Sequence, residues 1–192
     1  MPELTATEPE SVPEDLIKAA KDAGVPDELV QAAAQSAGLS VEVAEIALAM
    51  GRIFNLGDEE AARSYVAQDF VDHEAPAGSP GGPEGYLATA RYMRDTFSDA
   101  KWQPEDFFAV GDKFAVRLRF SGRHTGEFLG VPPTGREINI QHLHLYRIAN
   151  GKAAEHWGGR DDLDLLTQLG AFVVQGTAPV TAGAYAPRAA AH

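Results

Sequence analysis

The spacing of apolar residues changes from the helical period to the strand period about halfway along the chain. Before residue 100, apolar positions recur every three or four residues, as is typical of amphipathic helices. This spacing predicts helices at 13–24, 26–38, 40–56, 58–70 and 83–99. Ser40 and Asp58 are suited to cap the third and fourth of these helices, because their side-chain oxygens can accept free backbone N–H groups.

After residue 100, apolar and polar residues alternate, which predicts half-buried strands. The segments are KFAVRLRF at 113–120, INIQHLHLYRI at 138–148, KAAEHWGGR at 152–160, and a weaker one at 102–112 that Pro104 confines to an edge or a strand start. Asn150-Gly151 indicates a tight hairpin between two of them. Helices followed by strands predict an α+β domain, in which helices close a curved antiparallel sheet into a cone.

Charge and composition divide the chain into three parts. Residues 1–60 hold 13 acidic and 3 basic side chains, so most of the net charge of −12 belongs to the N-terminal part. We predict an acidic extension at 1–39, disordered at first and then forming two short helices, a cone domain at 40–175 and a flexible tail at 176–192. An acidic chain without a basic stripe is a poor partner for nucleic acid or for an anionic membrane surface.

The composition also bears on the compartment. The chain has no cysteine, which excludes thiolate chemistry and favours the cytoplasm. The first residues have neither a basic start nor an apolar run, so we expect no secretory signal. Residues 165–187 are uncharged, but Pro179 and several glycines interrupt them, so we expect no transmembrane helix.

Alternation in the second predicted strand places His142, His144 and Tyr146 on one face. Two histidines in this arrangement can be part of a metal site, with a third ligand from His124, His73 or Asp161. They can equally be polar residues on a cavity wall. We favour the cavity wall and expect no metal, because no third ligand stands at a recognisable spacing.

The stretch EHWGGRDD, residues 155–162, contains two adjacent aspartates at the end of a strand. Alternation places Trp157 and Asp161 on one face and His156 on the other. Apolar surroundings beside a tryptophan would raise the pKa of Asp161 towards that of a useful base. Either aspartate could instead cap the following helix. We assign the cavity to Asp161 and the helix cap to Asp162.

The connection at 124–137, HTGEFLGVPPTGRE, is rich in turn residues, and Phe128 is predicted at the rim of the cavity. Phosphate-binding loops, a dinucleotide fingerprint and a Gly-x-Ser-x-Gly elbow are all absent from the sequence. Nucleotide chemistry and serine hydrolysis therefore have no support.

The ordered motifs HTGEF, GxPPTG, YRIxxGK, EHW and QLG, within about residues 41–171, resemble the SnoaL-like polyketide cyclases, or ester cyclases. The resemblance implies a nuclear transport factor 2-like cone, usually dimeric, and ring closure by intramolecular aldol condensation without metal or organic cofactor. It implies that Asp161 is the general acid/base. It also implies a polar residue at the position of His144 and matches an Asp-His pair to Asp72 and His73.

We therefore expect a cofactor-independent enzyme acting on a small polyketide-like substrate, with Asp161 as base and His144 stabilising the enolate. The candidate substrate contacts are His73, His142, Tyr146, Trp157, Phe128 and Arg119. Two alternatives stay open: a non-catalytic binding or assembly module, and a hydratase or epoxide-opening enzyme. We expect a homodimer, with the acidic N-terminal helices available to bind another protein.

Overall fold

The computed structural model describes residues 13–22, 25, 30 and 40–171. The elements are α1 (Glu14–Asp22), α3 (Val41–Leu56), α4 (Glu59–Tyr65), β1 (Val66–Asp72), α5 (Gly82–Thr96), β2 (Phe97–Val110), β3 (Lys113–His124), β4 (Glu137–Ala149), β5 (Lys152–Arg160) and α6 (Asp162–Leu169). The predicted helix at 26–38, the disorder predicted for the first residues and the tail at 176–192 lie outside these residues, except Val30, which is helical.

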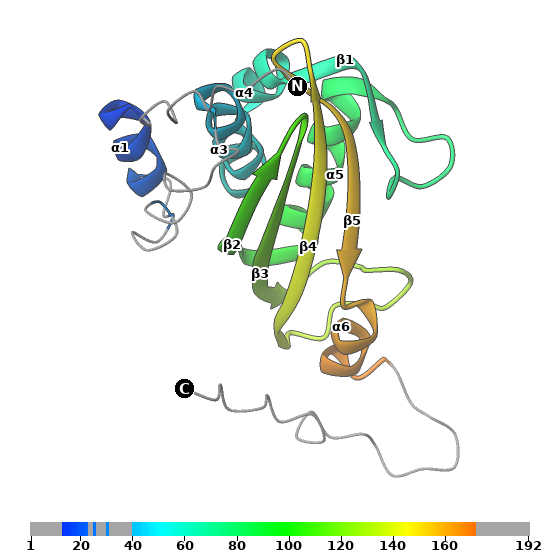
Figure 1. The fold of residues 1–192 in the computed structure, drawn as a ribbon. Coiled ribbons are helices and arrows are strands. Elements are labelled where there is room, and N and C mark those ends of the chain that lie inside the picture. The colour runs from blue at the N-terminus through cyan, green and yellow to red at the C-terminus, as the bar shows by residue number, and fades with distance from the viewer. Residues whose placement is uncertain (1–12, 23–24, 26–29, 31–39, 172–192) are drawn as a thin grey trace, which may run out of the picture.

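Five strands form one curved sheet in the order β1-β5-β4-β3-β2. Strands β2 to β5 are antiparallel neighbours, whereas β1 pairs with β5 in parallel. The sheet is therefore mixed, and the prediction of a purely antiparallel sheet is wrong at this edge. Figure 1 shows α3 and α5 beside the curved strands and α1 farther out, next to α3. The α+β cone predicted from the sequence is confirmed.

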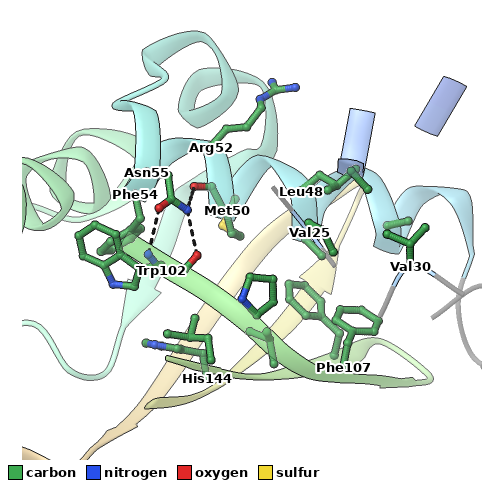
Figure 2. Close-up of a pocket in the computed structure, with 18 of the residues that line it drawn as sticks. Val25, Val30, Leu48, Met50, Arg52, Phe54, Asn55, Trp102, Phe107 and His144 are labelled. Carbon is green, nitrogen blue, oxygen red and sulfur yellow. Dashed lines mark hydrogen bonds between the residues drawn. The ribbon is translucent and has the colours of Figure 1, made fainter. Parts of the chain in front are cut away.

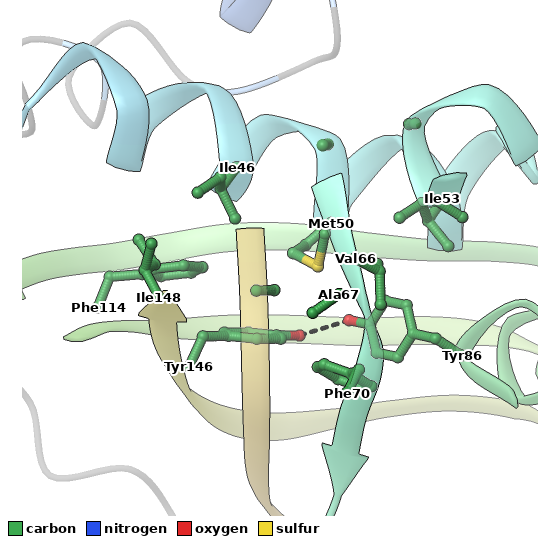
Figure 3. Close-up of a cluster of buried hydrophobic side chains, with 14 of the residues drawn as sticks. Ile46, Met50, Ile53, Val66, Ala67, Phe70, Tyr86, Phe114, Tyr146 and Ile148 are labelled. Carbon is green, nitrogen blue, oxygen red and sulfur yellow. Dashed lines mark hydrogen bonds between the residues drawn. The ribbon is translucent and has the colours of Figure 1, made fainter. Parts of the chain in front are cut away.

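Helix α3 carries much of the core. Its N-cap is Ser40, whose side chain accepts the N–H of Val43 as predicted. The buried face of α3 packs on a cluster that includes Phe114 and Ile148 from the sheet, shown in Figure 3. The members of that face are Val43, Ile46, Ala49, Met50 and Ile53. Four of these positions recur at helical spacing, so burial of one stripe stabilises the helix on the sheet.

Two predicted helices are shorter than their patterns indicated. The helix predicted at 58–70 ends at Tyr65, and β1 begins at Val66, because the segment from Val66 gains ladder partners on β5 that no local pattern reveals. The helix predicted at 83–99 ends at Thr96, where β2 begins. Tyr92, predicted in the buried face of this helix, is 45% exposed.

The β4–β5 hairpin fixes which side chains face the interior. Asn150 and Gly151 both have positive φ, 52° and 73°, as the predicted tight turn requires. The resulting register places His144 opposite Gly158 and Tyr146 opposite His156. Residues directly opposite in a ladder share a face. The β4–β5 register shifts at a bulge between Arg147 and Ile148. Beyond this bulge, the even-numbered residues of β5 therefore point inward with His142 and His144. Within the described part of the chain, no helix is long and apolar enough to cross a membrane.

Candidate active site

An aspartate and three histidines form a hydrogen-bonded row through the interior of the cone, which we call the histidine chain. Asp72 Oδ1 lies 2.8 Å from Nδ1 of His156, and His156 Nε2 lies 2.8 Å from Nδ1 of His144. His144 Nε2 lies 3.3 Å from Nδ1 of His142. The Nε2 atom of His142 is shielded from solvent and has no hydrogen-bond partner among the described residues. The row therefore has a carboxylate at one end and an unpartnered nitrogen at the other.

Three strands bring the histidine chain together. Asp72 is the last residue of β1 and stands beside His156 in the parallel β1–β5 ladder. His142 and His144 lie two residues apart on β4 and so share one face. Gly158 of β5 stands opposite His144, and a Cβ there would lie 3.4 Å from both His144 Nδ1 and His156 Cε1. The missing side chain lets the two rings approach each other.

The hydrogen bonds select one tautomer for each ring. An ionised Asp72 only accepts, so His156 donates from Nδ1 and its Nε2 is left as an acceptor. His144 then donates to that atom from Nδ1, and His142 donates from Nδ1 to Nε2 of His144. This assignment leaves a lone pair on His142 Nε2. His142 borders a cavity, so this lone pair is a candidate acceptor for a proton from a ligand.

Burial sets the charge of these groups. It lowers the pKa of His142 to about 3, with help from the nearby Arg160 charge. Burial lowers the pKa of His144 well below its ordinary value, and the nearby Arg160 charge adds to this effect. Burial alone would raise the pKa of Asp72, but its hydrogen bonds with His156 and with the Glu74 N–H outweigh burial and leave that pKa lowered. At neutral pH His142 and His144 are uncharged and Asp72 is ionised.

The histidine chain borders a cavity of about 330 Å³, which we call the reaction chamber. His142, His144 and His156 line it from the sheet. Phe128, 7% exposed, lines it from the loop after β3, so its predicted place at the cavity is confirmed. Arg160 supplies a positive charge to the same wall. Most other lining residues are apolar, as expected of a small-molecule site with a few polar groups.

Tyr146 supports the histidine chain from the side. Its ring stacks on that of His156 with centroids 4.7 Å apart. Its hydroxyl lies 2.6 Å from the hydroxyl of Tyr86, as Figure 3 shows. Burial raises the pKa of both phenols, so both stay protonated and one donates to the other. Tyr146 faces the interior as predicted, but its hydroxyl is already hydrogen-bonded to the hydroxyl of Tyr86.

The two aspartates at the end of β5 are placed the opposite way from the prediction. Asp161 is the N-cap of α6, and its Oδ1 accepts the N–H of Asp164. Asp162 lines the reaction chamber and lies 3.6 Å from Arg160. Alternation fails here because β5 ends at Arg160 and Asp161 has φ −79° and ψ 68°, outside the extended region. The predicted cavity position of Asp161 is therefore wrong, and its catalytic role stays a prediction.

Besides Tyr146, three predicted substrate contacts do not line the reaction chamber. Trp157 and His73 stack on each other at 4.7 Å, and the His73 ring bonds Glu155 at 3.0 Å. Arg119 pairs with Glu105 at 3.0 Å. Trp157 and Arg119 are odd-numbered strand residues and so point opposite to His142 and His144. Placing Trp157 in the cavity was an error about which face of β5 turns inward.

Sequence reasoning missed His156 and did not assign Asp72 a role of its own. His156 stands inside the EHW motif, and Asp72 in the Asp-His pair matched by resemblance, so both signals were present. What was missing was the register that joins residues 84 apart. His73 and Asp161, two proposed metal ligands, lie apart from His142 and His144, and the described residues contain no group of three or more side chains able to hold one metal ion.

A cone that encloses an aspartate-anchored histidine chain beside a mostly apolar chamber defines a protein with an acid/base site for a small molecule. Residues 44–169 match the family of SnoaL-like polyketide cyclases, and the chain belongs to that family.

Two relatives are cyclases by name. The aklanonic acid methyl ester cyclase DnrD of Streptomyces peucetius is 28% identical over 124 residues, which cover 63% of this chain and 86% of that protein. The nogalonic acid methyl ester cyclase of Streptomyces nogalater is 31% identical over 122 residues, 61% of this chain and 89% of that protein. Among solved structures, TsrD from Streptomyces laurentii superposes with a TM-score of 0.65 at 29% identity, covering 70% of this chain and 99% of TsrD.

Proposed function

We propose that the protein is a ring-closing enzyme that uses the histidine chain as its acid/base group on a small polyketide-like substrate. One observation carries this proposal: a buried, unpartnered His142 Nε2 at the end of a row that Asp72 anchors. An unsatisfied buried nitrogen is costly unless a ligand completes it. The names of the relatives supply the reaction class, closure of a ring on a polyketide methyl ester.

The proposed reaction begins at a carbon flanked by carbonyl groups. His142 Nε2 accepts a proton from this carbon, and the C–H electron pair becomes an enolate. The enolate carbon attacks a second carbonyl carbon of the same molecule, forming the ring C–C bond and leaving an alkoxide on that carbon. The alkoxide then takes the proton back from His142. Protons and electrons balance within one substrate molecule, and the chamber contributes by holding the two carbons close together.

The histidine chain makes a weakly basic His142 useful as a base. When His142 gains a proton at Nε2, it can pass its Nδ1 proton to His144, which passes its own to His156. The positive charge then rests on His156, 2.8 Å from the Asp72 carboxylate, instead of on the desolvated His142 or His144. His142 and His144 change tautomer, His156 becomes protonated on both nitrogens, and reversal of the same hops returns the proton to the alkoxide.

Arg160 is the group proposed to stabilise the enolate. His144 was expected in this role, but both of its ring nitrogens are engaged by histidines. Arg160 stands opposite His142 in the β4–β5 ladder and lines the reaction chamber. A fixed positive charge beside the reacting carbon stabilises the negative charge that develops on the enolate oxygen.

Ring closure of aklanonic acid methyl ester and nogalonic acid methyl ester, followed by chromatography, tests the proposal. His142→Asn keeps an amide near the position of Nδ1 but removes the Nε2 base, so turnover should fall at least ~10²-fold. Asp161→Asn should stay within a fewfold of wild type, because asparagine caps a helix as well as aspartate does.

The resemblance-based assignment predicts the reverse, since it makes Asp161 the base. Full activity of His142→Asn together with an inactive Asp161→Asn would overturn the histidine chain as the acid/base group. Failure of the wild type to close either ring, while both esters bind, would favour the alternative of a binding module.

We extend the proposal to a cytoplasmic homodimer of secondary metabolism, with a cone domain at 40–175 flanked by an extension and a tail. The outward face of the sheet supports the dimer, because three of its apolar side chains are exposed: Val71 by 46%, Phe108 by 56% and Leu143 by 52%. Light scattering should give twice the chain mass for wild type and a lower mass for Leu143→Asp. A monomeric wild type would remove this part of the proposal.

A further inference from the structure

A second cavity, of about 230 Å³, lies between α1, α3 and strands β2 and β3, and we call it the apolar chamber. Its wall is mostly apolar, with Leu16 and Ile17 from α1, Ala47 and Leu48 from α3, and Phe107 and Phe114 from the sheet, and Asp22, Arg52 and Asn55 are polar residues at its border. Figure 2 shows Leu48, Val25 and Val30 above Phe107 in this space. Helix α1 precedes residues 44–169, so part of the wall lies outside the segment that matches the family.

The two chambers meet at three shared residues, Phe54, Trp102 and His144. Asn55 fixes this junction, since its side chain accepts the N–H of Trp102 at 2.9 Å and donates to the carbonyl of the same residue at 3.1 Å. His144 is the middle ring of the histidine chain. A molecule in the apolar chamber can therefore contact His144, one ring of the histidine chain.

Gly51 is an unusual residue at the border of this cavity. It stands inside α3, where glycine is the least favourable residue after proline. Its φ is not in the left-handed region, and a Cβ built there meets no atom within 4 Å. Gly51 lines the apolar chamber and is exposed to solvent, so it stands where the chamber opens to the surface. Neither the backbone nor close packing requires glycine at this position.

We propose that the apolar chamber binds an alkyl or aryl arm of the substrate, while the reacting carbonyl end lies in the reaction chamber. The acyclic side chain or terminal ring of a polyketide fits this division, because its apolar part needs a dry wall and its carbonyls need the polar one. The substrate class rests on the proposed ring closure, whereas the binding site itself does not. The extension thus selects substrates by the length of their apolar arm.

Straight-chain methyl ketones with alkyl chains of three to eleven carbons are the probes. Trp102 at the junction reports binding by fluorescence in a Trp157→Phe background, which leaves it as the single tryptophan. In the full chain, the dissociation constant should fall by up to roughly fourfold for each added methylene until the chamber is full. Gly51→Leu should abolish this gain for the longer ketones, leave the shortest unaffected and keep the helical circular dichroism signal.

Two matched pairs of variants make the test specific. Gly51→Ala adds one carbon and should stay close to wild type, in contrast with Gly51→Leu. On α1, Leu16→Gln should raise the dissociation constant of long ketones at least about threefold. Ala19→Gln, on the exposed side of the same helix, should leave it unchanged. Equal chain-length dependence in wild type, Gly51→Leu and Leu16→Gln would overturn the proposal. Because binding is measured without turnover, this result is distinguishable from a failure of ring closure.

Discussion

Strand β5 carries two histidine–carboxylate clusters, one on each face, and they differ chiefly in burial. The inner cluster joins His156 to Asp72 at 2.8 Å, and the outer one joins His73 to Glu155 at 3.0 Å. Inside, burial lowers the pKa of His142 and His144 and the rings form a continuous row. Outside, the His73 side chain is 39% exposed and stacks on Trp157. The proposed acid/base site is the cluster from which water is excluded, where electrostatic interactions between the same kinds of groups are stronger.

The largest effect should come from removing the carboxylate that anchors the inner cluster. Asp72→Asn leaves no negative charge to favour the protonated His156, so kcat should fall at least ~10²-fold in the ring-closure assay. Glu155→Gln makes the same chemical change on the outer face and should leave kcat within about twofold of wild type. Equal losses in the two variants would show that the two faces do not differ in function.

Gly158→Val should separate the inner rings without changing any of them. A Cβ at this position meets His144, His156 and Glu74 at 3.2 to 3.4 Å, and two further methyl groups would push the rings apart. Misplacement of acid/base groups by about 1 Å can cost up to ~10²-fold in rate, so kcat should fall by an intermediate amount. The neighbouring Gly159→Val is the control, since a Cβ there meets only the Leu143 carbonyl at 3.9 Å. A normal kcat in Gly158→Val would argue against proton transfer between the rings.

Acid should destabilise the fold through the inner cluster. The folded pKa of His142 and His144 is below the unfolded value of about 6.5, so the unfolded chain binds more protons as the pH falls below 6.5. The free energy of unfolding should therefore decrease by at most about 1.4 kcal/mol per pH unit for each ring. Protonation of Asp72 lowers the free energy of unfolding further only below about pH 4, because folding lowers the pKa of this carboxyl from its ordinary value near 4.

Urea unfolding at pH 7, 6 and 5 measures this dependence. His142→Asn should reduce the slope of unfolding free energy against pH by about 0.7 kcal/mol per unit between pH 7 and 6 and by about 1.2 kcal/mol per unit between pH 6 and 5. Burial also lowers the pKa of His124, so the wild-type slope contains that contribution and the difference between the two proteins isolates His142. An unchanged slope in the variant would mean that His142 is not held neutral by burial.

The smallest effect is expected for Trp157, the residue that motif reasoning placed in the cavity. Trp157→Phe keeps an aromatic ring against His73 on the outer face. The kcat and KM values for ring closure should stay within about twofold of wild type. A loss of tenfold or more in either value would place Trp157 in the site after all.

Local pattern was sufficient for the elements but not for their pairing. The helical stripe of α3, the alternation in β3 and β4, and the Asn150-Gly151 turn were all read correctly, because each depends on neighbours within a few residues. Strand β1 was read as helix, since its only ladder partner lies more than 80 residues away on β5. Because β1 was absent from the prediction, the parallel pair that makes the sheet mixed was missed as well.

The candidate site depended on the same missing information. His142 and His144 were found because they share one strand face, which alternation shows directly. His156 was assigned to the wrong face, because the orientation of β5 is set by its register with β4 and by a bulge near Ile148. Asp161 was mistaken for a strand residue although the strand ends one residue earlier. The predicted site differs from the observed one because strand pairing between distant residues could not be predicted, whereas the residue types were recognised correctly.

Nitrogen-15 NMR of the histidine side chains at pH 8 tests the central claim most directly, because Nδ1 and Nε2 give different signals when protonated and when free. The histidine chain predicts that His142, His144 and His156 are all neutral, with the proton on Nδ1 and a lone pair on Nε2. Asp72→Asn should disturb this pattern as far as His142, the far end of the row. A proton on Nε2 of His142 in wild type, or no change at His142 in Asp72→Asn, would contradict the account.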